Sequence, residues 1–177
     1  MALRIEIPEV KPALEFIDGR LVQKVSPRRA HAQLQARWLL ALRTWAGDRG
    51  EALAEWRFSF ARSGAGWSSL VPDVGFVRRE LLDAIPAAEA EEPQFAPDVA
   101  VEILSPSDRR GDVEWKIAAY LAGGTALVVT VDPRAQQVLA YDRVATTAFV
   151  PGDTFAHAAL PGFSLDVADL FNGVFSG

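Results

Sequence analysis

The sequence contains no cysteine among its 177 residues. Disulfide bonds, thiolate metal sites and a cysteine nucleophile are therefore excluded. It also lacks a glycine-rich phosphate loop, and it shows no serine–histidine–aspartate arrangement, since His157 has no evident nucleophile near it. These absences direct the search for a functional site to the acidic and basic side chains.

Long hydrophobic runs are missing as well. No run approaches the length of a membrane span, and the segment MALRIEIPEVKP carries charges where a signal peptide has its apolar core. We therefore expect a cytoplasmic protein without a membrane partner. No internal repeat and no long linker divides the chain, so residues 1–177 are predicted to form one domain.

Lysine is scarce, because the chain has fifteen arginines but only Lys11, Lys24 and Lys116. The net charge of -5 argues against a generic nucleic-acid binder, which is usually basic. Local fields guide ligands more than the net charge does, however. Nucleic acid stays among the expected partners because four arginines cluster around the first predicted helix: Arg28, Arg29, Arg37 and Arg43.

The pattern of apolar and turn residues predicts an α/β (α+β) fold with helices packed against a sheet. A hairpin is expected within 13–27, turning at Asp18-Gly19, followed by a helix over 28–50. Residues 79–96 are predicted to be irregular, with one helical turn. The remaining elements are expected as strands at 52–61, 71–77, 98–104, 126–132 and 137–142, a loop at 63–66, a helix at 109–124 and a terminal helix within 160–171.

Glu102 stands inside the apolar strand predicted at 98–104. Burying an unpaired carboxylate costs several kcal/mol, so this residue needs a partner. Alternation places Val99, Val101 and Ile103 on the core face and Asp98 with Glu102 on the other. Asp98 lies about 13 Å along the strand from Glu102, too far for both to bind one ion, so Asp98 is expected only as a supporting residue, as is Asp112.

Asp73, in a second Pro-Asp-Val, is the better partner for Glu102. If its strand neighbours residues 98–104, facing side chains lie about 5 Å apart, which suits two carboxylates that bind Mg²⁺. Gly75, on the same face, is expected to leave room for a ligand. The alternative is that Asp73 only follows a proline at a turn. Glu15 and Asp18 are further acids that could extend the cluster, although the hairpin turn explains Asp18 equally well.

Lys116 is the third element of the predicted site. Asp112, Lys116 and Tyr120 recur at four-residue intervals and form one stripe on the helix that follows the Glu102 strand. An exposed Asp–Lys pair is the simpler interpretation. A lysine with apolar neighbours, in a chain that otherwise prefers arginine, indicates instead a need for a compact ammonium.

Taken together, Pro72-Asp73, Glu102 followed by Ser105-Pro106-Ser107, and the stripe ending before Gly123 resemble a bacterial family of restriction-endonuclease-like proteins in the PD-(D/E)XK nuclease superfamily. The resemblance runs from LEFIDGRLV to LPGFSLDVADLF. It implies a mixed central sheet flanked by helices, with an N-terminal β-hairpin extension. It further implies DNA as a partner, and a homodimer is one option for the assembly.

The resemblance also implies roles for particular residues. Asp73, Glu102 and the backbone carbonyl of Ile103 would hold Mg²⁺ or Mn²⁺, and a lysine would orient the attacking water. Leu104 stands where the superfamily pattern has that lysine, so Lys116 is its match on the helix. His31 corresponds to a family histidine that could contact substrate, and Gln35 follows one turn later.

Two functions follow from these observations. The first is a Mg²⁺-dependent phosphodiesterase that hydrolyses DNA, with Asp73, Glu102 and Lys116 at its centre. The alternative is a non-catalytic domain that keeps the nuclease fold for nucleic-acid binding or assembly. The missing strand lysine and the acidic charge favour the alternative, whereas the joint presence of two acids, a lysine and Tyr120 favours the enzyme.

Overall fold

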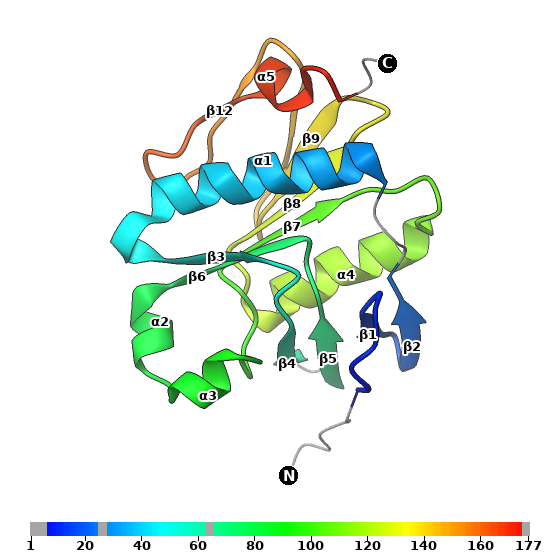
Figure 1. Cartoon of the computed structure of the whole chain (residues 1–177), viewed down its shortest axis with the longest axis vertical. Coiled ribbons are helices and arrows are strands. Elements are labelled where there is room, and N and C mark those ends of the chain that lie inside the picture. The colour runs from blue at the N-terminus through cyan, green and yellow to red at the C-terminus, as the bar shows by residue number, and fades with distance from the viewer. Residues whose placement is uncertain (1–6, 25–27, 63–65, 175–177) are drawn as a thin grey trace.

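A six-stranded mixed sheet forms the centre of the computed structural model, which describes residues 7–24, 28–62 and 66–174 (Figure 1). Its strand order is β10-β9-β8-β7-β6-β3. The strands are β3 (Gly50–Ala54), β6 (Val74–Arg78), β7 (Val99–Ile103), β8 (Leu127–Asp132), β9 (Gln137–Tyr141) and β10 (Thr146–Phe149). Only β7 and β8 run parallel, because helix α4 (Arg110–Gly123) carries the chain back between them.

Helix α1 (Arg29–Ala46) covers one face of this sheet. Its apolar stripe of Leu34, Trp38 and Leu42 is fully buried against the core face of β7, the side of Val99 and Val101. The alternation predicted for residues 98–104 is thereby confirmed. A short strand pair, β11 (Thr154–Phe155) with β12 (Leu165–Asp166), and helix α5 (Val167–Phe171) close the same core.

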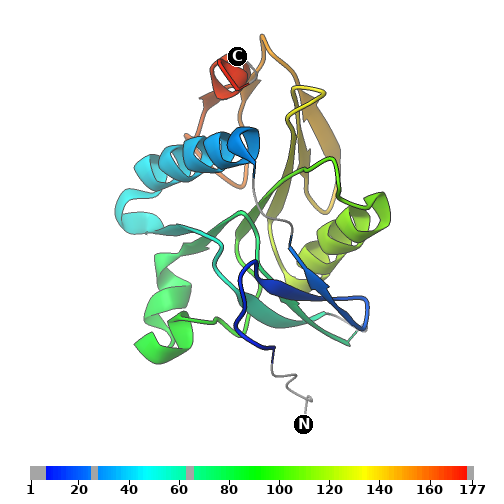
Figure 2. The same cartoon turned by 45° about the vertical axis from the view of Figure 1, so that its right-hand side comes forward.

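Helix α4 and a second, four-stranded sheet cover the opposite face, as Figure 2 shows. The order of this sheet is β2-β1-β5-β4, with β1 (Leu14–Ile17), β2 (Arg20–Gln23), β4 (Phe58–Arg62) and β5 (Gly66–Leu70). The predicted hairpin is therefore present, with Asp18 in a left-handed turn. The hairpin lies outside the central sheet and joins the second sheet, because β1 also pairs with β5.

Two local expectations were wrong. The strand expected at 52–61 is divided between β3 and β4, because Glu55 has a φ of 52° and turns the chain from one sheet to the other. Residues 79–96 contain two short helices, α2 (Arg79–Asp83) and α3 (Ala87–Ala90), in place of one turn. The loop expected at 63–66 lies largely outside the described residues.

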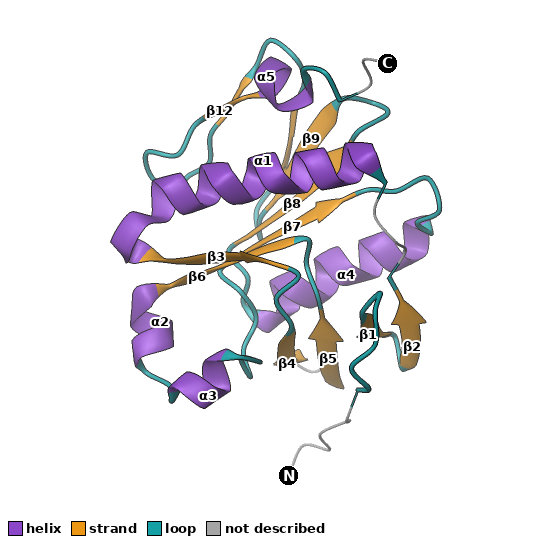
Figure 3. Ribbon diagram, in the orientation of Figure 1, coloured by secondary structure: helices purple, strands orange, loops and turns teal. Residues whose placement is uncertain are grey.

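The remaining predicted elements are found, and Figure 3 shows the resulting arrangement of helices around strands. A 3-10 turn, η1 (Gly47–Arg49), follows α1, and Gly124 ends α4 in the left-handed conformation that glycine favours. The predicted α+β class with a mixed central sheet is confirmed. Of the helices in the described residues, none is both long and apolar enough to cross a membrane.

Candidate active site

Asp73 and Glu102 lie on neighbouring antiparallel strands. Val74 of β6 pairs with Val101 of β7, and continuing this register by one residue sets Asp73 opposite Glu102. Both side chains are buried, with 2% of Asp73 and 8% of Glu102 exposed. The expected neighbourhood of the two strands is confirmed, and Asp73 is more than a residue that follows a proline at a turn.

The Asp73 carboxylate has a partner on each oxygen. Its Oδ1 accepts a 2.7 Å hydrogen bond from the ammonium of Lys24, and its Oδ2 lies 3.1 Å from Nε2 of His31. The backbone N–H of Ile103 also donates to Oδ2, at 2.7 Å. Gln35 also holds this residue by donating to the Asp73 backbone carbonyl at 3.0 Å.

These partners decide the charge of Asp73. Burial alone would raise its pKa, but the ammonium of Lys24 and the hydrogen bond from His31 lower it well below the usual range. Burial would likewise lower the pKa of Lys24, yet Asp73 and Glu102 raise it further than burial lowers it. Asp73 and Lys24 therefore form an ion pair at neutral pH.

Glu102 is held by helix α4. The Lys116 ammonium lies 2.7 Å from its Oε2, and the Tyr120 hydroxyl donates to its Oε1 at 3.0 Å. Lys116 also lies 3.1 Å from Oε1 of Glu15, which in turn accepts the backbone N–H of Val71. The predicted approach of Lys116 to Glu102 is confirmed, and Glu15 does extend the acidic cluster.

The pKa values at this second pair are also shifted. Burial raises the pKa of Glu102 to about 7, with Lys116 opposing this shift and Glu15 adding to it. Burial alone would lower the pKa of Lys116, but Glu102 and Glu15 raise it above its usual range. Burial also raises the pKa of Tyr120, which stays a neutral hydrogen-bond donor.

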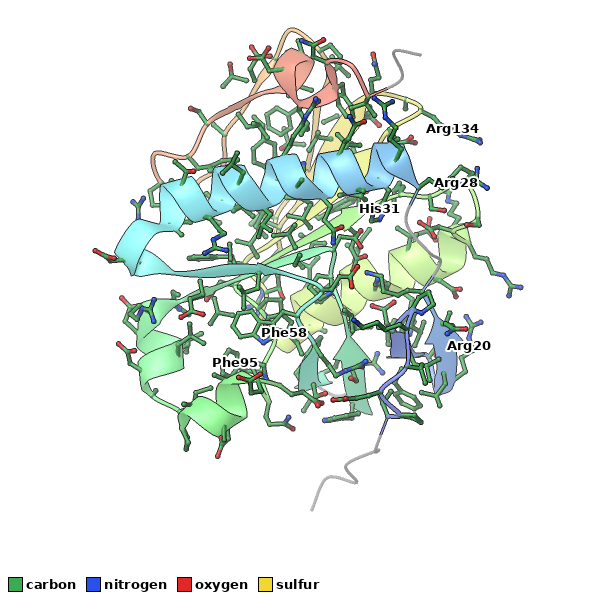
Figure 4. All side chains as sticks on the ribbon, viewed as in Figure 1. Arg20, Arg28, His31, Phe58, Phe95 and Arg134 are labelled. Carbon is green, nitrogen blue, oxygen red and sulfur yellow. The ribbon has the colours of Figure 1, made fainter. Side chains whose placement is uncertain are left out.

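This cluster lines a pocket of about 1070 Å³. The hairpin of β1 and β2, the start of α1, the loop after β7, the first turns of α4 and the loop after β8 form its walls. In Figure 4, Arg20, Arg28 and Arg134 lie on the same side of the molecule as His31. All three arginines are exposed and border the pocket.

Two predicted supporting residues lie outside the cluster. Asp112 is at the pocket border and forms an ion pair with Arg20 of β2. Asp98 is at the far end of β7, where it lies 3.1 Å from the Arg78 guanidinium and accepts the Arg78 backbone N–H. A supporting role for Asp98 in the cluster is therefore not confirmed, because the strand rise separates it from Glu102 as the sequence indicated.

The expectation for Gly75 was wrong. A Cβ atom at this position would lie 2.7 Å from the ring of Phe58, so the space beside the glycine is filled by an aromatic side chain rather than by a ligand. Ser105 and Ser107 bond to each other in the loop after β7, and neither caps α4.

Lys24 was missed in the sequence as a site residue. It comes from the last described residue of the hairpin segment and reaches Asp73 across 49 residues of chain. The scarcity of lysine was the available signal, because two of the three lysines lie in this cluster while Lys11 is exposed.

The donor set fits a hard divalent cation. Asp73 and Glu102 supply carboxylate oxygens from facing positions, and the Ile103 N–H, which donates to Asp73, fixes the backbone next to them. Mg²⁺ is commonly held by one or two carboxylates and keeps several waters. In the described ranges, no three or more histidine, aspartate or glutamate side chains are grouped so as to hold a metal ion. A metal site here would therefore rest on two carboxylates, a backbone carbonyl and water.

A comparison with known protein families shows the family of this chain. Residues 3–168 match the Uma2 family, whose description is "Putative restriction endonuclease". The chain belongs to this family. The resemblance seen in the sequence is thereby confirmed.

A solved structure also resembles this Uma2 family member. The crystal structure of "a putative nuclease belonging to DUF820" from Anabaena variabilis has a TM-score of 0.82 and 28% sequence identity, over 95% of this chain and 94% of that chain. No curated protein matches the chain. The family and the structural neighbour together support a nuclease-like function.

Proposed function

We propose that this Uma2 family member is a Mg²⁺-dependent nuclease that hydrolyses phosphodiester bonds in DNA. One observation carries the proposal: Asp73, Glu102 and Lys116, from three distant segments, meet in one buried cluster at a large pocket. Clusters of buried, perturbed ionisable groups in a cleft are typical of active sites.

In this proposal Asp73, Glu102 and the carbonyl of Ile103 hold the metal ion. A bound Mg²⁺ would stabilise negative charge on the phosphate and lower the pKa of a water molecule. Mn²⁺ has the same preference for oxygen ligands and is expected to replace it.

Lys116 orients the attacking water. An ammonium has three donors, and Lys116 directs two of them to Glu102 and Glu15. The third remains for a water molecule in the pocket. The contact of Lys116 with Glu102 supports Lys116 as the counterpart of the lysine that the superfamily pattern has at the position of Leu104.

Glu15 and Tyr120 act as positioning residues. Glu15 fixes the Lys116 ammonium, and Tyr120 holds one oxygen of Glu102 so that the other faces the lysine. On the Asp73 side, His31 and Gln35 restrain the carboxylate and its backbone. Such preorganisation lets charged groups act without rearranging during the reaction.

Exposed arginines at the pocket border support a phosphate-rich substrate. Arg28, Arg109 and Arg134 line the pocket and form no ion pair with the described residues. Guanidinium groups bind phosphate oxygens in a bidentate manner, so these three side chains suit a nucleic-acid backbone. The local arrangement outweighs the net charge of -5.

A cleavage assay tests the proposal. Wild-type protein is incubated with Mg²⁺ or Mn²⁺ and with linear, supercoiled and single-stranded DNA, beside RNA. We expect metal-dependent cleavage of DNA that falls by about 10²-fold or more in Asp73→Asn, Glu102→Gln and Lys116→Met. The matched control is Asp98→Asn, which changes an acid at the other end of β7 and should cleave as wild type does.

A non-catalytic nuclease-fold domain is the second candidate, and one observation favours it. Asp73 and Glu102 each already have a lysine partner, so the site holds its charges together without a metal. DNA binding without cleavage under every metal condition would decide for this alternative. Metal-dependent cleavage that survives in Glu102→Gln would assign the activity to a contaminant.

A further inference from the structure

Lys24 occupies the position of a cation beside Asp73. Its ammonium lies 2.7 Å from Oδ1 of Asp73 and donates to the carbonyl of Val71 at 2.8 Å, and 15% of its side chain is exposed. A carboxylate and a carbonyl oxygen are also the ligands that a hard divalent cation prefers. Lys24 and a metal ion at Asp73 would therefore compete for the same carboxylate.

The two lysines of the cluster differ in what they would keep if a metal bound. Lys116 has two carboxylate partners, Glu102 and Glu15, and it would keep its ion pair with Glu15 if Glu102 bound a metal ion. Lys24 has a single carboxylate partner within the described ranges, which is Asp73. An ammonium next to a divalent cation on the same carboxylate is repelled by it. Lys24 is consequently the charge that has to leave.

The total charge of the cluster supports the same conclusion. Three buried carboxylates, Glu15, Asp73 and Glu102, are opposed by two ammonium groups. The cluster is thus close to neutral without a metal, and a divalent ion added to it would leave an excess of positive charge. Release of Lys24 removes one positive charge from Asp73 and restores the balance.

We propose that Lys24 is an exchangeable internal cation, which holds Asp73 in the metal-free protein and is displaced toward the substrate phosphate when a divalent ion binds. The proposal rests on the metal site of the proposed function and adds a residue to it. Lys24 and Arg28 both line the pocket, so a displaced ammonium stays in a pocket that already carries positive charge for phosphate. Metal binding and substrate binding would be coupled through this side chain.

Ammonium spectra of the wild-type protein test the exchange directly. Because the chain has three lysines, ¹H–¹⁵N NMR of the side-chain ammonium groups distinguishes the two lysines in buried ion pairs, Lys24 and Lys116, from the exposed Lys11. Addition of Mg²⁺ without DNA should shift or broaden the Lys24 signal and retain that of Lys116. The ammonium signals are assigned from the spectra of Lys24→Met and Lys116→Met, each of which lacks the signal of the replaced lysine.

Metal affinity provides the second measurement. Titration of Mn²⁺ followed by electron paramagnetic resonance should give binding to Lys24→Met that is about tenfold tighter than to wild type, because the competing charge is gone. Lys11→Met is the matched control and should bind Mn²⁺ as wild type does. Binding to Lys24→Met alone, with none to wild type, would also support the exchange.

Two outcomes would overturn the inference, and only one of them also rejects the proposed metal site. In the first, Mn²⁺ binds to the wild type and Glu102→Gln weakens this binding, but the Lys24 signal does not change and Lys24→Met binds Mn²⁺ with the same affinity as the wild type. This outcome rejects the exchange and leaves the nuclease proposal intact. No binding to wild type or to Lys24→Met rejects the metal site, and the exchange falls with it.

Discussion

Replacing Lys116 by methionine removes the ammonium between Glu102 and Glu15 while keeping a long, flexible side chain. Both acids are buried, with 8% of Glu102 and 4% of Glu15 exposed. The variant would therefore leave two carboxylates close together in a protein interior without their shared cation. We expect a large loss of stability from this single change.

The magnitude follows from the distances. At 2.7 Å from Glu102 and 3.1 Å from Glu15, Coulomb's law with an effective dielectric constant of about 20 gives about 6 and about 5 kcal/mol of attraction. Desolvation offsets much of this, and deleting one partner of a buried pair typically costs about 3–5 kcal/mol. Because Glu102 already has a pKa of about 7, it can take up a proton in the variant and limit the loss.

Urea unfolding followed by tryptophan fluorescence measures this loss, since the chain has five tryptophans. We expect Lys116→Met to lose about 3 kcal/mol near pH 8 and clearly less near pH 5.5, where Glu102, with its raised pKa, is protonated. Adding Glu102→Gln to this variant should recover about 2 kcal/mol, because the two residues interact directly. Lys11→Met should change stability by less than about 0.5 kcal/mol.

Two results would refute the reasoning. A loss below about 1 kcal/mol near pH 8 would mean that the ammonium is not required to compensate buried charge. Additive effects of Lys116→Met and Glu102→Gln would mean that the two side chains do not interact in solution.

Three further predictions concern the pocket and its walls. The pKa of Glu102 is raised in the folded protein from 4.5 to about 7, so its contribution to stability is complete below about pH 4.5 and is lost as the pH rises through 7. This loss should be absent in Glu102→Gln, and a free energy of unfolding that depends on pH in the same way in the variant and the wild type would contradict the prediction. Arg28→Gln and Arg134→Gln should each reduce the slope of log affinity for DNA against log salt by about 1, and unchanged slopes in binding titrations would exclude phosphate contacts. Gly75→Ala should destabilise by about 1–3 kcal/mol, since its Cβ would lie 2.7 Å from the Phe58 ring; an unfolding midpoint equal to wild type would show that the ring moves aside without cost.

Local patterns in the sequence were sufficient for most elements and for the centre of the site. The spacing of Leu34, Trp38 and Leu42 predicted the helix that covers the core, and alternation along β7 placed Glu102 away from Val101. Periodicity of this kind reflects which face of an element is buried, and it is readable over a few residues. Lys116 and Tyr120 were predicted to share a helix stripe for the same reason, and both contact Glu102.

Local periodicity did not predict where strand β3 ends, or that the residues after it join the second sheet rather than the central one. Trp56, Phe58 and Phe60 continue an apolar alternation through the point where the chain leaves the central sheet at Glu55. Alternation reports burial but not the identity of the sheet that a strand joins, because both sheets offer an apolar face. The division of this segment was decided by pairing with β5 and β6, which are distant partners.

Only the tertiary structure decided which charges neutralise the site. Lys24 and Glu15 lie on the N-terminal hairpin, and their partners Asp73 and Lys116 lie 49 and about 100 residues further along the chain. No local pattern encodes such pairs, because a charged side chain in the sequence carries no sign of whether water or an opposite charge will surround it. The packing of the second sheet against helix α4 buries these side chains, and the cost of burying a charge alone then requires them to pair.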